Sequence, residues 1–215
     1  MTELEKLKRM SFRDKIWYIW EYYKFHILGV IGISLVLYVI GTSMYRSTFD
    51  TVFSCVYLNN RSEQELNTDL VTKGFREHLE LNDKQLISTE SMYISYGNDA
   101  TEFSYASLAK IPALVASRQL DVMICDQENF DHFASLDGFY NLETSLPEDV
   151  LSLVKDRIVY GTSQEGVTIP CGIDLTGTAF ARQSHLAMEP AILSIVGNST
   201  HMDYISEFLR YIFSL

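Results

Sequence analysis

Short polar side chains at three points of the sequence are the residues best suited to bind a small molecule. They are Asn59, Asn60, Asn98, Asp99, Asp126 and Gln127. Each pair closely follows an apolar run, and amide and carboxylate groups can hydrogen-bond a polar or cationic ligand. The alternative interpretation is that they are ordinary turn residues, because turns favour Asn and Asp in any protein.

Two tyrosines could complete such a site. Tyr140 and Tyr160 each follow or belong to a short apolar stretch in the second half of the chain. A tyrosine ring offers a flat apolar face and a polar hydroxyl, so either could stack on a bound ligand. The expected binding residues are therefore Asn59, Asn98, Asp126, Gln127, Tyr140 and Tyr160.

The sequence carries no strong motif for catalysis, a metal or a cofactor. Gly161 and Gly166 have the spacing of a phosphate-binding loop, but Val167 stands where that loop requires lysine. The five histidines are not paired at metal-ligand spacing, and neither GxSxG nor HExxH occurs. We therefore expect no enzyme activity, no metal site and no cofactor.

The three cysteines leave two interpretations open. Cys55 and Cys125 fall in strands that we expect to be neighbours, so a disulfide outside the cytoplasm is one interpretation. The other is that both are buried free thiols, because cysteine in a strand behaves as a small apolar residue. Cys171 has no obvious partner.

Residues 50–136 alternate between strand and helix patterns. Strands are predicted at 51–58, 91–96 and 121–125, and helices at 64–80 and 102–118 with a short one ending at 136. Such alternation favours a parallel sheet with helices on both faces, the first strand lying between the other two. The carboxyl ends of the three strands would meet at one edge, where open sheets bind ligands.

The remainder of the chain adds further strands and a last helix. Residues 157–160 and 166–170 are predicted as two strands around a turn, and residues 191–196 as another strand. Apolar residues at helical spacing predict a C-terminal helix over 204–212. The fold class is therefore α/β, with a three-layer lobe.

In this order the elements of residues 50–215 resemble the extracellular solute-binding proteins that feed ABC importers. The resemblance is carried by residues 120–127 (LDVMICDQ), 133–142 (FASLDGFYNL), 160–174 and 191–199. It implies a lobe that binds a solute at its strand ends and serves a transporter. Members of that family have two lobes, whereas only about 15 residues separate Asp174 from Glu189, so one lobe is expected here.

The N-terminal part predicts a transmembrane helix. Residues 25–45 contain no Asp, Glu, Lys or Arg, and a helix of that length spans about 30 Å, the thickness of the bilayer core. Aromatic side chains, which prefer the headgroup level, flank it at Trp17, Tyr18, Trp20, Tyr22, Tyr23 and Tyr45. We expect a juxtamembrane segment at 1–24, a membrane helix at 25–46 and an extracytoplasmic domain at 47–215.

The charge distribution sets the expected orientation. Residues 1–49 carry seven Lys and Arg against four Asp and Glu, whereas residues 50–215 carry ten against 24. The positive-inside rule then places the N-terminus in the cytoplasm and the acidic domain outside. A cleaved signal peptide ending at Gly41-Thr42-Ser43 and a buried core helix are the alternative interpretations. The acidity argues against nucleic-acid binding.

Together these features predict a non-enzymatic, single-pass membrane protein with a binding or interaction domain. Its expected partners are the lipid bilayer, a membrane protein or transporter subunit of the cell envelope, and a small polar or cationic ligand. The alternative function is a ligand-sensing ectodomain. Because a head of 24 residues has no room for a signalling domain, sensing would act through a second membrane protein.

Overall fold

The computed structural model describes residues 12–96 and 101–215, and it divides the chain into two compact units. The first unit is Met1–Phe49 and the second is Asp50–Leu215. Asn98 and the basic residues Lys6, Lys8 and Arg9 lie outside the described residues. Each unit is treated by itself below.

The described part of the first unit consists mainly of one long helix, α2 (Phe12–Arg46). Its part Tyr23–Arg46 is long and apolar enough to cross a membrane, and none of it is buried inside the protein. One polar group within the run is satisfied locally, since the Thr42 hydroxyl donates to the Tyr38 carbonyl oxygen at 2.9 Å. The helix is continuous from residue 12 through the apolar run, so the part of the juxtamembrane segment that the structure describes is helical as well.

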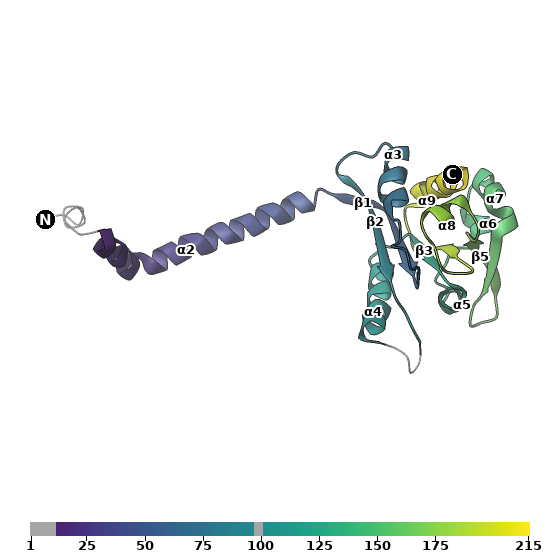
Figure 1. The fold of residues 1–215 in the computed structure, drawn as a ribbon, viewed down its shortest axis with the longest axis horizontal. Helices are drawn as coiled ribbons and strands as arrows, with labels where there is room; N and C mark the ends of the chain where they lie inside the picture. Colours follow the sequence, from purple (N-terminus) through teal and green to yellow (C-terminus); the bar gives the residue numbers. More distant parts are fainter. Residues whose placement is uncertain (1–11, 97–100) are drawn as a thin grey trace. The chain divides into compact units, whose positions relative to one another are not determined.

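The second unit is built on a six-stranded sheet with the order β2-β1-β3-β6-β5-β4 (Figure 1). The strands are β1 (Asp50–Leu58), β2 (Gln85–Met92), β3 (Val122–Cys125), β4 (Ile158–Thr162), β5 (Thr168–Asp174) and β6 (Ile192–Ile195). β1 pairs in parallel with both β2 and β3, so the expected central place of the first strand is confirmed.

The other half of the sheet is antiparallel, which corrects the expectation of a parallel-sheet lobe. β6 runs antiparallel to β3 and to β5, and β4 runs antiparallel to β5. The physical reason is the short connection between β4 and β5, because a turn of five residues can join only antiparallel strands. The fold is therefore mixed α/β.

Helices cover both faces of the sheet. They are η1 (Leu70–Phe75), α3 (Arg76–His78), α4 (Glu102–Ala116), α5 (Gln127–Ser135), α6 (Leu142–Ser145), α7 (Glu148–Val154), η3 (Lys155–Arg157), α8 (Ala179–Gln183) and α9 (Met202–Ser214). α7 and α9 lie side by side (Figure 1). Side chains begin several of these helices: the Thr101 hydroxyl accepts the Ser104 N–H at α4, and Thr178 does the same at α8.

Alternate residues of β1 point into two separate cores. Phe53 and Tyr57 belong to a core that packs against η1, α6, α7, α8 and α9, where Phe53 lies 4.7 Å from Phe208 between ring centroids. Val56 and Leu58 belong to the opposite core, beneath α4 and α5. A strand buried on both faces reads as a continuous apolar run, which explains why β1 was predictable from sequence.

Strand β2 is displaced from its predicted position at 91–96. It occupies Gln85–Met92, and it is an edge strand, paired only with β1. Five of its eight residues are polar and only Met92 is buried, so the strand lacks a clear apolar pattern. Met92 and Ile94, which suggested the later position, are buried core residues near and beyond its end.

One buried carboxylate connects the two halves of the sheet. Asp121, directly before β3, accepts the Ser54 N–H of β1 at 2.8 Å through Oδ2. Its Oδ1 accepts the Ser199 hydroxyl at 2.5 Å and lies 3.1 Å from His201 Nδ1. Asp121 is only 1% exposed, and burying an unpaired carboxylate costs folding free energy. The three hydrogen-bond donors around Asp121 offset that cost.

We expect Asp121→Asn to lower the free energy of unfolding by about 2–4 kcal/mol, because an amide nitrogen would replace one acceptor oxygen among these donors. Urea unfolding of the full chain in detergent, followed by circular dichroism, measures the change. Asp137→Asn is the matched control: Asp137 lies in an exposed turn with φ of 55°, which Asn also adopts. Equal stability of the two variants would contradict the role assigned to Asp121.

Candidate functional site

The predicted site at the strand ends begins with Asn59, the residue after β1. Its backbone is left-handed, with φ of 60°, a conformation that Asn adopts more readily than most residues. The side chain bridges the rim: Oδ1 accepts the Ile94 N–H at 2.8 Å, and Nδ2 donates to Asp126 Oδ2 at 3.1 Å. Asn59 is 6% exposed, so its polar groups are committed to the protein.

Asp126 fills the neighbouring position and caps α5. Its Oδ1 accepts both the backbone N–H of Asn129 at 3.0 Å and the Asn129 amide at 2.7 Å. Asn129 in turn accepts the Tyr96 hydroxyl at 2.9 Å. Burial first, and then the charges of Glu128 and Asp126, raise the Tyr96 pKa, so the phenol keeps the proton that it donates.

These four side chains form one hydrogen-bonded chain, Asn59–Asp126–Asn129–Tyr96. A ligand could reach the polar groups of Asn59 only by displacing bonds that the fold already makes, and at Asp126 it would share a carboxylate that already accepts three hydrogen bonds. The structure thus brings Asn59 and Asp126 together as predicted, but the rim between them is occupied by the protein itself.

The other predicted residues do not join them. Gln127 is exposed and donates to Asp131 Oδ1 at 2.9 Å. The Tyr140 N–H donates to the Ile195 carbonyl oxygen, and Ile195 pairs with Val122 at the start of β3. Tyr140 therefore lies at the opposite end of the sheet from Asp126, contrary to expectation, because it bonds beside the end of β6, which runs antiparallel to β3.

Tyr160 lies on β4, at the far edge of the sheet, and is 59% exposed. Asn98 belongs to the residues that the structure does not describe. Of the six predicted binding residues, the structure thus places only Asn59, Asp126 and Gln127 at one rim.

The cysteines are free and buried. Cys55 points into the core beneath α9, whereas Cys125 points into the core beneath α5. Although their strands are neighbours, the two side chains lie on opposite faces of the sheet and cannot bond. Burial raises the pKa of both thiols, and it raises the pKa of Cys171 to about 11.

A polar hollow lies beside the closed rim, and sequence reasoning missed it. It measures about 410 Å³ and is lined by Asn60, Ser62, Gln64, Glu65, Leu66, Thr68 and Ser91. The Asn60 side chain connects this hollow to the segment between α8 and β6, because its Oδ1 accepts the Ala187 N–H at 2.7 Å. Gln64, Glu65 and Ser91 have side chains with no hydrogen bond to the described part of the chain, so they can bind a ligand. The feature of the sequence that could have indicated this hollow is the polar run that follows β1.

An apolar hollow of about 190 Å³ opens on the face that carries α4 and α5. Met123 of β3 and Val196, just after β6, belong to its lining, together with Ile111 and Val115 from α4 and Leu136 after α5. Leu136 is 54% exposed, so it adds apolar surface at the mouth of this opening. Its residues are scattered through the sequence, so no local pattern indicated it.

The chain has no significant match among protein-family models, curated proteins or solved structures. The resemblance to solute-binding proteins therefore stays a prediction from the sequence.

The three thiols should resist alkylation in the folded protein. Raised pKa values keep them protonated through the range near pH 8–9 in which an ordinary thiol ionises, and burial also denies access. We expect slow labelling by a maleimide in the native state and rapid labelling of three thiols after unfolding without reductant. A sample with fewer than three thiols after unfolding would contradict the free cysteines.

Proposed function

We propose that the protein is a single-pass membrane protein with its N-terminus in the cytoplasm and residues 50–215 outside. The apolar part Tyr23–Arg46 of α2 supports the crossing, because nothing in the described chain covers it. The excess of basic residues before this part and of acidic residues after it supports the orientation.

The folded domain acts as a non-enzymatic interaction domain in this proposal. The observation that carries it is the internal hydrogen bond between Asn59 and Asp126. This bond occupies the rim where a solute-binding lobe would hold its ligand, so solute capture at that place is not favoured. The surface that we propose for a partner is the apolar hollow beside Leu136.

The partner that best fits this hollow is a membrane or envelope protein, such as a transporter subunit, that inserts an apolar side chain between α4 and α5. The hollow is small and almost wholly apolar, which suits one anchoring side chain of an amphipathic segment. The resemblance to a solute-binding lobe supports service to a transporter.

The orientation is tested by labelling intact cells with a membrane-impermeant maleimide. Gln164→Cys, in the exposed β4–β5 turn, should be labelled, whereas Glu5→Cys should react only after the cells are opened. The buried native cysteines should give little background. Labelling of the opposite residue would reverse the proposed orientation, and loss of residues 1–43 from the mature chain would indicate a cleaved signal peptide.

The interaction surface is tested by a photo-reactive amino acid at Leu136, with Leu153 as the matched control. Both are exposed to a similar degree, 54% and 51%, but Leu153 lies on α7, which covers the opposite face of the sheet from the hollow. We expect one membrane or envelope protein to cross-link in a fixed ratio at residue 136 and not at 153. Equal cross-linking at both positions would contradict a partner at the hollow.

A second candidate function is ligand sensing, which the polar hollow favours. Glu65 is the only charged residue of its lining, so the hollow suits a small cationic or polyhydroxylated molecule. Its volume falls within the range of small-molecule sites. A signal would then pass to a second membrane protein.

We expect a thermal-shift screen of the full chain in detergent, using amino acids, amino sugars and sugars, to reveal any such ligand. A compound at about a hundred times its dissociation constant would add about 2.7 kcal/mol of stability. Glu65→Gln should abolish the shift by removing the charge, whereas the exposed neighbour Glu63→Gln, outside the hollow, should preserve it. A shift that survives Glu65→Gln would exclude this hollow as the site.

A further inference from the structure

A further hollow of the folded domain lies where the chain passes from β5 through α8 to β6. It measures about 170 Å³. The β5–α8 turn, α8 and the α8–β6 connection supply its lining, which consists of Thr176, Gly177, Ala181, Arg182, Leu186, Met188, Glu189 and Ala191. The hollow is therefore built from one continuous stretch of the chain.

The buried side chains of this lining are apolar. Ala181 and Met188 are each 6% exposed and Ala191 is 1% exposed, and all three belong to the core that packs against α9. Leu186 is half-buried against the same core. An aliphatic group that enters the hollow would therefore leave water for an apolar surface, which is favourable.

Hydrogen bonds hold the walls of the hollow in place. The Thr176 hydroxyl oxygen accepts the Ala191 N–H at 3.1 Å, and the Thr176 carbonyl oxygen accepts Arg157 Nη1–H at 3.2 Å. The Leu186 N–H donates to the Ala181 carbonyl oxygen at 2.9 Å. Because these bonds exist without a ligand, binding would not require the walls to be ordered first.

Arg182 and Glu189 bring opposite charges to the lining from two different segments. Both residues are exposed. Arg182 Nη1 donates to the Gly177 carbonyl oxygen at 2.5 Å, which restrains the guanidinium group. Its Nη2 and Nε, and the Glu189 carboxylate, have no hydrogen bond or ion pair with the described part of the chain. Two guanidinium nitrogens thus remain for a carboxylate, the group that arginine binds best.

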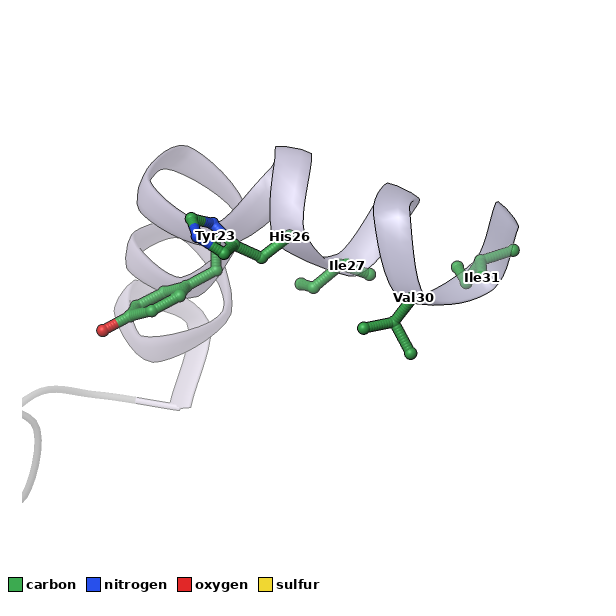
Figure 2. Close-up of a pocket in the computed structure, with 5 residues that line it drawn as sticks. All are labelled: Tyr23, His26, Ile27, Val30 and Ile31. Carbon is green, nitrogen blue, oxygen red and sulfur yellow. The ribbon is translucent and has the colours of Figure 1, made fainter. Parts of the chain in front are cut away.

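The charges distinguish this hollow from the open face of α2 that Figure 2 shows. That face has no Asp, Glu, Lys or Arg in its lining, which consists of Tyr23, His26, Ile27, Val30 and Ile31. It therefore offers no fixed charge that would select a ligand, whereas the hollow beside α8 offers one charge of each sign.

We infer that the hollow beside α8 binds a zwitterionic α-amino acid with an aliphatic side chain. The Arg182 guanidinium binds the carboxylate, the Glu189 carboxylate binds the ammonium group, and the aliphatic side chain packs against Met188. An ion of one sign would be repelled by one of the two charges, whereas a zwitterion satisfies both. The hollow is smaller than the roughly 300–1,000 Å³ of sites for drug-sized ligands, so it suits a single amino acid better than a peptide or an oligosaccharide.

The test measures the binding of L-leucine to the full chain in detergent by isothermal titration calorimetry. Two analogues isolate the charges: N-acetyl-L-leucine lacks the ammonium group, and L-leucinamide lacks the carboxylate. We expect L-leucine to bind, and each analogue to bind at least about tenfold more weakly, because each leaves one charge of the hollow without its partner.

Substitutions in the protein test the same two contacts. Arg182→Gln and Glu189→Gln should each raise the dissociation constant for L-leucine by about tenfold or more. Arg118→Gln and Glu165→Gln are the matched controls, because they remove exposed charges outside the hollow, and they should leave binding unchanged. Circular dichroism checks that each variant folds, and the analogues test the inference on the unaltered chain if one does not.

The inference goes beyond the proposed function and depends only on the folded domain. No binding of L-leucine, equally tight binding of either analogue, or binding that survives both Arg182→Gln and Glu189→Gln would overturn it. Binding that is lost in Glu65→Gln but kept in Arg182→Gln would assign L-leucine to the polar hollow instead, which overturns this inference and supports ligand sensing there. None of these results affects the membrane crossing or the partner surface at Leu136, because neither proposal uses Arg182 or Glu189.

Discussion

The carboxylate of Asp121 is the interaction on which the folded domain depends. β3 is only four residues long, yet it is the seam between the parallel half and the antiparallel half of the sheet. Asp121 extends this short strand by binding the Ser54 N–H of β1, and it holds Ser199 and His201, which lead from β6 into α9. Because a buried carboxylate must be surrounded by donors, it forces three segments that are distant in the sequence to meet at one place.

The other end of β3 is also occupied by polar groups that serve the fold. There Asp126 binds Asn59 and Asn129, and Tyr96 completes the chain. Both ends of the central strands are thus closed by hydrogen bonds within the protein. Two hollows of the domain lie beside the strand ends and could bind a ligand or a partner. One is the polar hollow beyond β1 and β2, and the other is the apolar hollow at the seam between β3 and β6. This arrangement favours contact with a protein or lipid surface over the capture of a solute at the strand ends.

The elements that the sequence predicted well are those whose surroundings leave a regular pattern of apolar residues in the sequence. β1 is buried on both faces and reads as a continuous apolar run, while α9 carries one apolar face and one polar face. The helix α2 needs only length and composition to be recognised. β2 was misplaced because an edge strand is held by backbone pairing with β1, which leaves little trace in its side chains. Tyr140 was assigned to the wrong end because its position depends on the direction of β6.

The sequence by itself determined the division into a basic, apolar helix and an acidic α/β domain, the central place of β1, and the polar character of the strand ends. These follow from local composition and period, which a chain carries wherever it folds. The tertiary structure alone decided that Asn59 and Asp126 bind each other, that Cys55 and Cys125 face apart, and where the hollows open. Those outcomes depend on strand direction, register and face, and these are set by contacts between residues far apart in the sequence, such as Leu70 and Tyr211, which are 141 positions apart.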